Sequence, residues 1–245
     1  MTDRRETPRG GPLDEPTIGL EVSSLTGTRT GDEHAAPPMG YEADVDEMTA
    51  AATEHSATDE THGDRGALLL IDLQEDFLGA PGLRDQRPAL LRAVRQWVDL
   101  AAAAGALVVE VRTELPDDPA AWALNMREDG QPVALAGTPG ASRVSELADL
   151  DMTTVLKRRD DGFLGTGLAE LLRGHGIDHL VIAGVSTQAC VAMTAASAYA
   201  HDLSVVLAGG AVASDDTHAH TEALRWLSDE YRQVVADPAE GWPGA

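Results

Sequence analysis

The sequence predicts a doubly wound α/β fold, with a six-stranded, mostly parallel sheet and helices on both of its faces. From Gly66 onwards, short apolar runs alternate with longer stretches of helical character. Most of these runs are apolar at successive positions, which is typical of strands buried on both faces. Their alternation with helices favours a parallel sheet. The expected strands are 67–72, 107–112, 152–156, 179–184, 203–208 and 232–235, and the expected helices are 88–104, 118–127, 166–175, 188–200 and 217–229.

Proline and glycine mark the ends of these helices. Pro88 suits the first turn of the helix that follows the first strand, and Gly105 suits its end. Gly174 and Gly176 bracket the end of the helix at 166–175 in the same way.

Residues 1–63 differ in composition from the rest of the chain. They contain 14 acidic and 4 basic residues and are rich in Gly, Pro and Thr but poor in aromatics. Such a segment buries too little apolar surface to offset its chain entropy, so we expect a disordered, acidic N-terminal tail. The two stretches with a local structural pattern are 18–22, as a strand, and 46–55, as a short helix. The expected folded domain is therefore 64–245.

Charge and composition exclude several classes of protein. Residues 64–245 carry 27 acidic and 14 basic residues, which argues against nucleic-acid binding. There is no apolar run long enough for a membrane helix and no apolar core of a secretory signal at the N-terminus. The single cysteine excludes an intrachain disulfide and fits a reducing compartment. A soluble, cytoplasmic protein is expected.

Three potentially reactive side chains stand at or just after the carboxyl ends of apolar runs. Asp72 ends the first run, Lys157 closes the third, and Cys190 lies six residues after the fourth. Lys157 is also the only lysine in the chain. Ligands bind at the carboxyl end of an open parallel sheet, so these three residues are candidate site residues.

Each candidate has a chemical role and a structural alternative. Cys190 is expected in the first turn of a helix, where unpaired N–H groups and the helix dipole lower the pKa of a thiol; the alternative is an inert buried cysteine. Asp72 could act as a general base or simply cap a loop. Lys157 could stabilise negative charge or lie at an exposed sheet edge. Arg158 and Arg159 could face a substrate carboxylate.

Four motifs occur in the order 72–77, 137–140, 156–168 and 184–191. They read Asp-Leu-Gln-Glu-Asp-Phe, Gly-Thr-Pro-Gly, Leu-Lys-Arg-Arg-Asp-Asp-Gly-Phe-Leu-Gly-Thr-Gly-Leu and Gly-Val-Ser-Thr-Gln-Ala-Cys-Val. Together they resemble the isochorismatase-like cysteine hydrolases, a family that includes nicotinamidases, N-carbamoylsarcosine amidases, ureidoacrylate and biuret amidohydrolases and streptothricin hydrolases. The resemblance covers residues 66–236 and implies the strand order 3-2-1-4-5-6.

The resemblance also implies roles for particular residues. Asp72, Lys157 and Cys190 match the catalytic triad, the Val185–Ser186 peptide matches a cis bond, and the backbone N–H groups of Ser186 and Cys190 match an oxyanion hole. The loops 73–87, 113–140 and 158–166 are expected to form the pocket walls. Candidate substrate-binding residues in or near these loops are Gln74, Phe77, Trp122, Phe163 and Gln188.

Departures from the family pattern bear on metal binding. Nicotinamidases of this family carry an Asp-x-His element after the second strand for a metal, whereas the stretch 112–118 has no histidine here. His218 and His220 are two residues apart and do not share a helix face. We therefore expect no metal and no cofactor.

The function expected is hydrolysis of a C–N bond in an amide, ureido or lactam group of a small molecule, through a thioester on Cys190. Family members that cleave the vinyl ether of isochorismate lack the cysteine, so the presence of Cys190 favours C–N hydrolysis, with vinyl-ether hydrolysis as an alternative. A catalytically silent binding module is another. A homo-oligomer, dimer or tetramer, is expected, without nucleic-acid or membrane partners.

Overall fold

The computed structural model describes residues 65–243. The expected disordered tail at 1–63, with its possible strand at 18–22 and helix at 46–55, lies outside these residues.

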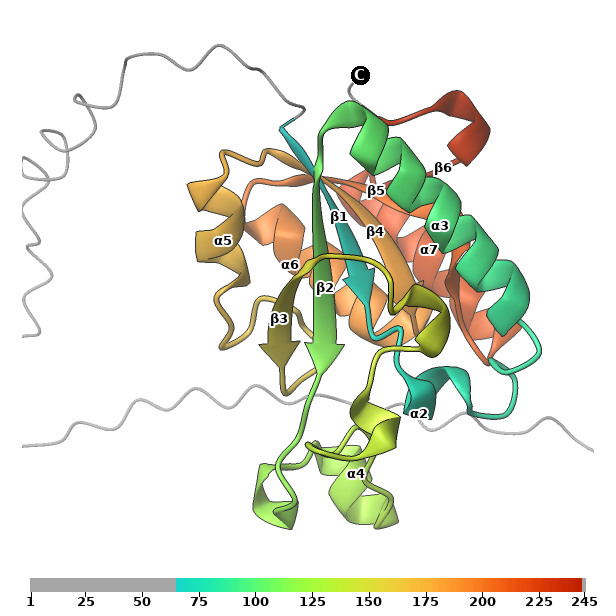
Figure 1. Ribbon diagram of the computed structural model, residues 1–245, viewed down its shortest axis with the longest axis vertical. Coiled ribbons are helices and arrows are strands. Elements are labelled where there is room, and N and C mark those ends of the chain that lie inside the picture. The colour runs from blue at the N-terminus through green and yellow to red at the C-terminus, as the bar shows by residue number, and fades with distance from the viewer. Residues whose placement is uncertain (1–64, 244–245) are drawn as a thin grey trace, which may run out of the picture. The chain divides into compact units, whose positions relative to one another are not determined.

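The sheet has six parallel strands in the order β3-β2-β1-β4-β5-β6, which confirms the predicted fold (Figure 1). Each strand begins and ends close to an expected apolar run, except that the fifth continues five residues further. The strands are β1 (Gly66–Ile71), β2 (Leu107–Thr113), β3 (Thr153–Lys157), β4 (His179–Val185), β5 (Ser204–Ala213) and β6 (Val234–Ala236).

Helices cover both faces of this sheet and bury two apolar cores. α3 (Arg87–Ala104) lies on one face, and α5 (Leu168–Gly174), α6 (Ala192–Ala200) and α7 (Thr217–Tyr231) lie on the other (Figure 1). Successive residues of β1 enter alternate cores, with Leu68 packed on the α3 side and Leu69 on the side of α5 and α6. This double burial explains why the strand is apolar at every position.

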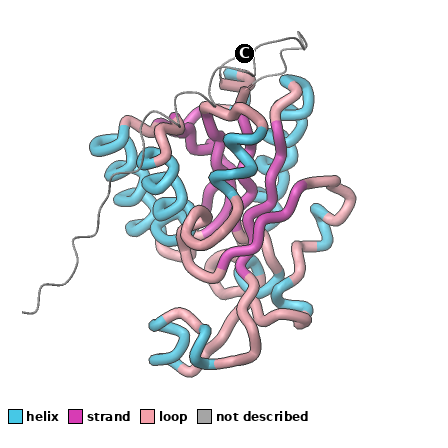
Figure 2. Tube along the Cα trace, turned by 90° about the vertical axis from the view of Figure 1, so that its left-hand side faces the viewer, coloured by secondary structure: helices cyan, strands magenta, loops and turns pink. Residues whose placement is uncertain are grey.

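The segment between β2 and β3 extends beyond the carboxyl end of the sheet (Figure 2). The helix expected at 118–127 is divided there into a 3₁₀ turn at Pro119–Ala121 and the short helix α4 (Leu124–Asp129). Trp122 separates the two because it is extended and its indole N–H donates to the Pro116 carbonyl (3.1 Å). Further 3₁₀ turns are Pro139–Ala141, Ser145–Leu147 and, after β6, Pro238–Glu240.

The short helix α2 (Glu75–Leu78) follows β1 and holds this segment in place. The Asp76 carboxylate accepts a hydrogen bond from the Ala134 backbone N–H (2.7 Å). None of the helices between residues 65 and 243 is both long and apolar enough to cross a bilayer.

The central strands β1 and β4 meet at Ile71 and Gly184, where the candidate site begins. A Cβ atom on Gly184 would lie 2.0 Å from the Ile71 carbonyl oxygen, and the φ angle of Gly184 is +133°. Only glycine fits both constraints without a shift of the backbone. Gly184 therefore lets β4 run close to the end of β1 and places the chain after β4 beside Asp72.

Candidate active site

Asp72 is the first residue after β1, and its carboxylate lies at the carboxyl end of the sheet, against the end of β2. Its φ angle is +52°, a left-handed conformation that aspartate tolerates better than most residues. One carboxylate oxygen, Oδ1, accepts hydrogen bonds from the backbone N–H and from the hydroxyl of Thr113, both at 2.9 Å. The residue is 1% exposed, so the carboxylate is held at a fixed position inside the protein.

Lys157, the last residue of β3, has a partner for each of the three N–H bonds of its ammonium group. Nζ lies 2.7 Å from Asp72 Oδ2, 2.7 Å from Thr113 Oγ1 and 3.3 Å from Cys190 Sγ. Burial disfavours the charged form, but the negative charge of Asp72 and the contact with Cys190 outweigh it and raise the pKa of Lys157. Lys157 therefore carries its charge at physiological pH and forms a buried ion pair with Asp72.

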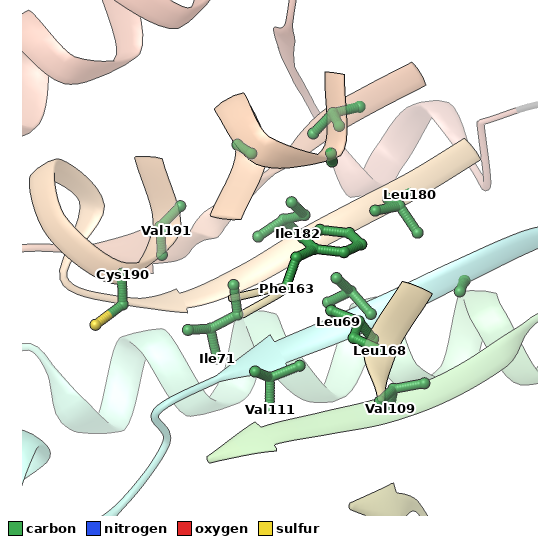
Figure 3. Packing of buried hydrophobic residues seen from close by; sticks show 14 of the residues in the cluster. Leu69, Ile71, Val109, Val111, Phe163, Leu168, Leu180, Ile182, Cys190 and Val191 are labelled. Atoms are coloured by element: carbon green, nitrogen blue, oxygen red, sulfur yellow. The ribbon is translucent and has the colours of Figure 1, made fainter. Parts of the chain in front are cut away.

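Cys190 lies in a π-helical turn, Thr187–Val191, that leads into α6. Figure 3 shows its sulfur at the edge of the apolar cluster that also contains Ile71 and Val191. Burial, together with the negative charge of Asp72, raises the pKa of the Cys190 thiol well above its ordinary value, although Lys157 opposes this. The lowered pKa expected from a helix end is wrong, because burial and the neighbouring carboxylate outweigh that local effect.

The turn that carries Cys190 begins with the Val185–Ser186 peptide, which is cis, as the resemblance implied. The Ser186 carbonyl accepts hydrogen bonds from the N–H groups of Ala189 (3.0 Å) and Val191 (3.3 Å). Thr187 is fully buried, and its hydroxyl pairs with His220 Nδ1 on α7 at 2.8 Å. Burial lowers the pKa of His220, so a neutral imidazole holds the turn at neutral pH.

Sequence reasoning missed Thr113 and Asp160. The hydroxyl of Thr113 links Asp72 to Lys157, and the Asp160 carboxylate lies 3.7 Å from the Cys190 sulfur. The second strand is predicted to end at residue 112, whereas β2 includes Thr113. A prediction one residue longer would place Thr113 at the same end of the sheet as Asp72. The only sequence feature that could have indicated Asp160 is its position as a carboxylate in the loop directly after Lys157.

Two of the five expected substrate-binding residues have structural roles instead. Gln74 is fully buried, with Nε2 bonded to the carbonyls of Thr113 and Ala141 (2.8 Å each) and Oε1 accepting from Thr113 N (3.0 Å). Its amide is therefore used to hold Thr113. Phe163 is buried and stacks on His201 at the far end of α6, with a centroid distance of 4.7 Å; its ring lies among core residues such as Ile182 (Figure 3).

The other three expected residues lie in different surroundings. Phe77 is half-buried and packs against the core on the α3 side of the sheet, and its contact with substrate stays a prediction. Trp122 is half-buried in the extended segment after β2. Gln188 is exposed, two residues before Cys190. Substrate contact by Trp122 and Gln188 stays a prediction.

Potential metal ligands are not clustered in the part of the chain that the structure describes. Within residues 65–243, no group of three or more His, Cys, Asp or Glu side chains is arranged to hold a metal ion. His220, one of the two histidines considered above, is engaged with Thr187.

A thiol, a carboxylate and an ammonium that meet at the carboxyl end of a doubly wound sheet define an enzyme-like site of the α/β class. The isochorismatase domain model matches residues 66–238, and the chain belongs to this family of hydrolases. The family predicted from the four motifs is therefore confirmed.

The similar proteins include a hydrolase, an amidohydrolase and a solved pyrazinamidase. Streptothricin hydrolase of Streptomyces noursei is 32% identical over 72% of this chain, and the match spans 64% of that protein, which is less than two thirds. Maleamate amidohydrolase of Pseudomonas putida is 29% identical over 71% of this chain and 84% of its own. The structure of Pyrococcus horikoshii pyrazinamidase in complex with zinc has a TM-score of 0.61 and 28% identity, covering 71% of this chain and 99% of that one.

Proposed function

We propose that this protein is a cysteine-dependent amidohydrolase that cleaves a C–N bond of a small molecule through a thioester. The observation that carries the proposal is the contact of the Cys190 sulfur with Lys157 Nζ at 3.3 Å, while the same ammonium holds Asp72 at 2.7 Å. The names of the relatives, which include an amidohydrolase, agree with it. The proposed chemistry uses groups of the chain itself and water, and the homo-oligomeric state stays a prediction.

The first half of the reaction forms the acyl-enzyme. Asp72 takes the thiol proton as the sulfur attacks the carbonyl carbon, and the carbonyl electron pair moves to oxygen. Backbone N–H groups of Ser186 and Cys190 are proposed to bind this oxyanion. The tetrahedral intermediate then collapses, the C–N bond breaks, and Asp72 returns the proton to the leaving amine. In the second half, Asp72 takes a proton from water as the water attacks the thioester, and the thiol leaves with that proton.

The electrostatics explain why a carboxylate is needed beside the nucleophile. Because the pKa of Cys190 is raised, the resting site holds a neutral thiol. Proton transfer to Asp72 exchanges a buried carboxylate for a buried thiolate, and Lys157 contacts both, so the net charge around the ammonium does not change. Arginine could not replace Lys157, because a planar guanidinium does not match three acceptors arranged around a point charge.

Two alternatives remain distinguishable by experiment. A vinyl-ether hydrolase acting on an isochorismate-like substrate would release a keto acid and would not require the thiol. A silent binding module would release nothing, although it would leave a buried ammonium–carboxylate pair and a thiol gathered for no chemical purpose.

A panel of primary amides, ureido compounds and lactams, assayed for released ammonia or amine, tests the proposal. Cys190→Ala is expected to abolish release, with unchanged circular dichroism, because the covalent step is lost. Ser204→Ala, at the opposite end of the sheet, is the matched control and should keep full activity. Undiminished turnover by the Cys190→Ala protein would exclude covalent catalysis at this residue.

A further inference from the structure

The buried Cys190 sulfur lies beside an exposed carboxylate that has no ion-pair partner within residues 65–243. Asp160 Oδ1 lies 3.7 Å from Sγ, and the Asp160 side chain is exposed. No ion pair involves Asp160 within residues 65–243. The carboxylate also contributes to the raised pKa of the thiol, so its charge reaches the sulfur.

The position of Asp160 is fixed by a buried residue of the nucleophile's own helix. Thr194 stands four residues after Cys190 and is fully buried. Its hydroxyl accepts a hydrogen bond from the Gly162 backbone N–H (2.9 Å) and donates to the Asp160 carbonyl (3.4 Å). A Cβ atom on Gly162 would lie 3.1 Å from the Thr194 methyl carbon, so the loop is tightly packed there. Thr194 thereby ties the loop that carries Asp160 to the helix that carries the sulfur.

Lys157 and Arg159, two cations on or beside this loop, bind other groups and form no ion pair with Asp160 within residues 65–243. Lys157 forms its ion pair with Asp72, and its three N–H bonds are all engaged. The guanidinium of Arg159 donates to the carbonyls of Ala121 (3.1 Å) and Arg158 (2.6 Å), which carry no formal charge. An incoming substrate therefore meets the carboxylate of Asp160 directly beside the nucleophile.

We propose that Asp160 is a specificity-determining residue that selects amides bearing an ammonium or guanidinium group near the scissile carbonyl. The inference rests on the proposed function, since the selected substrates are those attacked by Cys190. It predicts discrimination against amides of equal size that carry a carboxylate. Arg158 and Arg159 would favour the opposite preference if they faced the substrate, and the experiment separates the two.

The potential at the sulfur can be measured without any substrate, because Cys190 is the only cysteine of the chain. Three methanethiosulfonates react with the same thiol and differ in charge. The 2-aminoethyl reagent is cationic, the methyl reagent is neutral and the 2-sulfonatoethyl reagent is anionic. The ratio of cationic to anionic rate constants, divided by the ratio for free cysteine, reports the local potential. The wild type should favour the cation, and Asp160→Asn should lower the ratio about tenfold, the factor that Coulomb's law gives in water between a cation and an anion about 6 Å from a carboxylate.

Asp161→Asn is the matched control. It removes the same charge from the next position, and asparagine keeps the side-chain oxygen that accepts from the Phe163 N–H (2.8 Å). The ratio should change much less in this variant, because Asp160 and not Asp161 contacts the sulfur. Equal effects of the two variants, a preference for the anion in the wild type, or a thiol that reacts with none of the three reagents would each overturn the inference.

A second measurement links the potential to catalysis. 3-Aminopropanamide, butanamide and succinamate have similar size and are cationic, neutral and anionic. kcat/KM should fall in that order. Asp160→Asn should lower the ratio of kcat/KM for 3-aminopropanamide to kcat/KM for succinamate about tenfold. Suppose that hydrolysis needs Cys190, but that the ratio of kcat/KM between the cationic and the anionic amide is the same in Asp160→Asn as in Asp161→Asn. That result would refute the role of Asp160 and leave the proposed function intact. A failure to cleave any amide, with an Asp160-dependent reagent ratio, would refute the proposed function and with it the selection of amides, and would leave only the effect of the Asp160 charge on the sulfur.

Discussion

Replacing Thr113 by valine removes a single oxygen from the hydrogen-bond network of the site and keeps the side-chain shape. That oxygen donates to Asp72 Oδ1 at 2.9 Å and accepts from Lys157 Nζ at 2.7 Å. Both partners are buried and charged, so neither finds water in its place. Asp72 keeps the backbone N–H of Thr113, but one N–H bond of the ammonium is left without an acceptor.

The expected cost follows from these two lost bonds. A hydrogen bond to a charged group contributes about 1.5–3 kcal/mol, and the loss of two such bonds, reduced by local relaxation, gives about 3 kcal/mol. For a domain of this size the melting temperature should fall by about 6–12 °C. Urea unfolding followed by tryptophan fluorescence measures the difference in unfolding free energy between the variant and the wild type. The slope of the free energy against urea concentration should not change, because the surface exposed on unfolding is the same.

Thr113→Ser is the matched control, because serine keeps the hydroxyl and loses only a methyl group. Its cost should be about 1 kcal/mol. The reasoning fails if Thr113→Val is no less stable than Thr113→Ser, since the hydroxyl would then contribute nothing to the pairing of Asp72 with Lys157.

Three further predictions address metal, packing and titration. Amide hydrolysis should survive exhaustive chelation, as measured by amine release after dialysis against a chelator, and a stoichiometric metal whose removal stops turnover would contradict this. Gly184→Ala should lower the unfolding free energy by more than about 3 kcal/mol in urea titrations, because its Cβ would overlap the Ile71 carbonyl oxygen at 2.0 Å; near-wild-type stability would show that the backbone can shift. The rate of Cys190 alkylation by iodoacetamide should keep rising above pH 9, because a raised thiol pKa delays thiolate formation to higher pH, and a plateau below pH 8 would refute the raised value.

The strands and the meeting of Asp72, Lys157 and Cys190 could be predicted because each rests on a local signal. A continuous apolar run indicates burial on both faces, and a reactive residue at its end indicates the sheet edge where ligands bind. Roles that depend on distant residues could not be predicted. The function of Gln74 depends on the Ala141 carbonyl, 67 residues away. The pKa of Cys190 depends on burial and on Asp72, which the helix-end argument did not include. Thr113 is a neutral residue whose importance comes only from its two charged neighbours.

The reactive side chains are joined across long stretches of chain, which makes the lone thiol an internal reporter of complete folding. Lys157 is 85 residues from Asp72 and 33 from Cys190, and the strands that carry the two charged residues are separated by β2 in the sheet. No short segment of the chain contains the site, so its contacts form only after non-local strand pairing, which is slow compared with helix formation. A chain with an unfinished sheet exposes Cys190 as an ordinary, reactive cysteine, whereas the finished sheet shields it. Pulse labelling during refolding therefore times the assembly of the site itself.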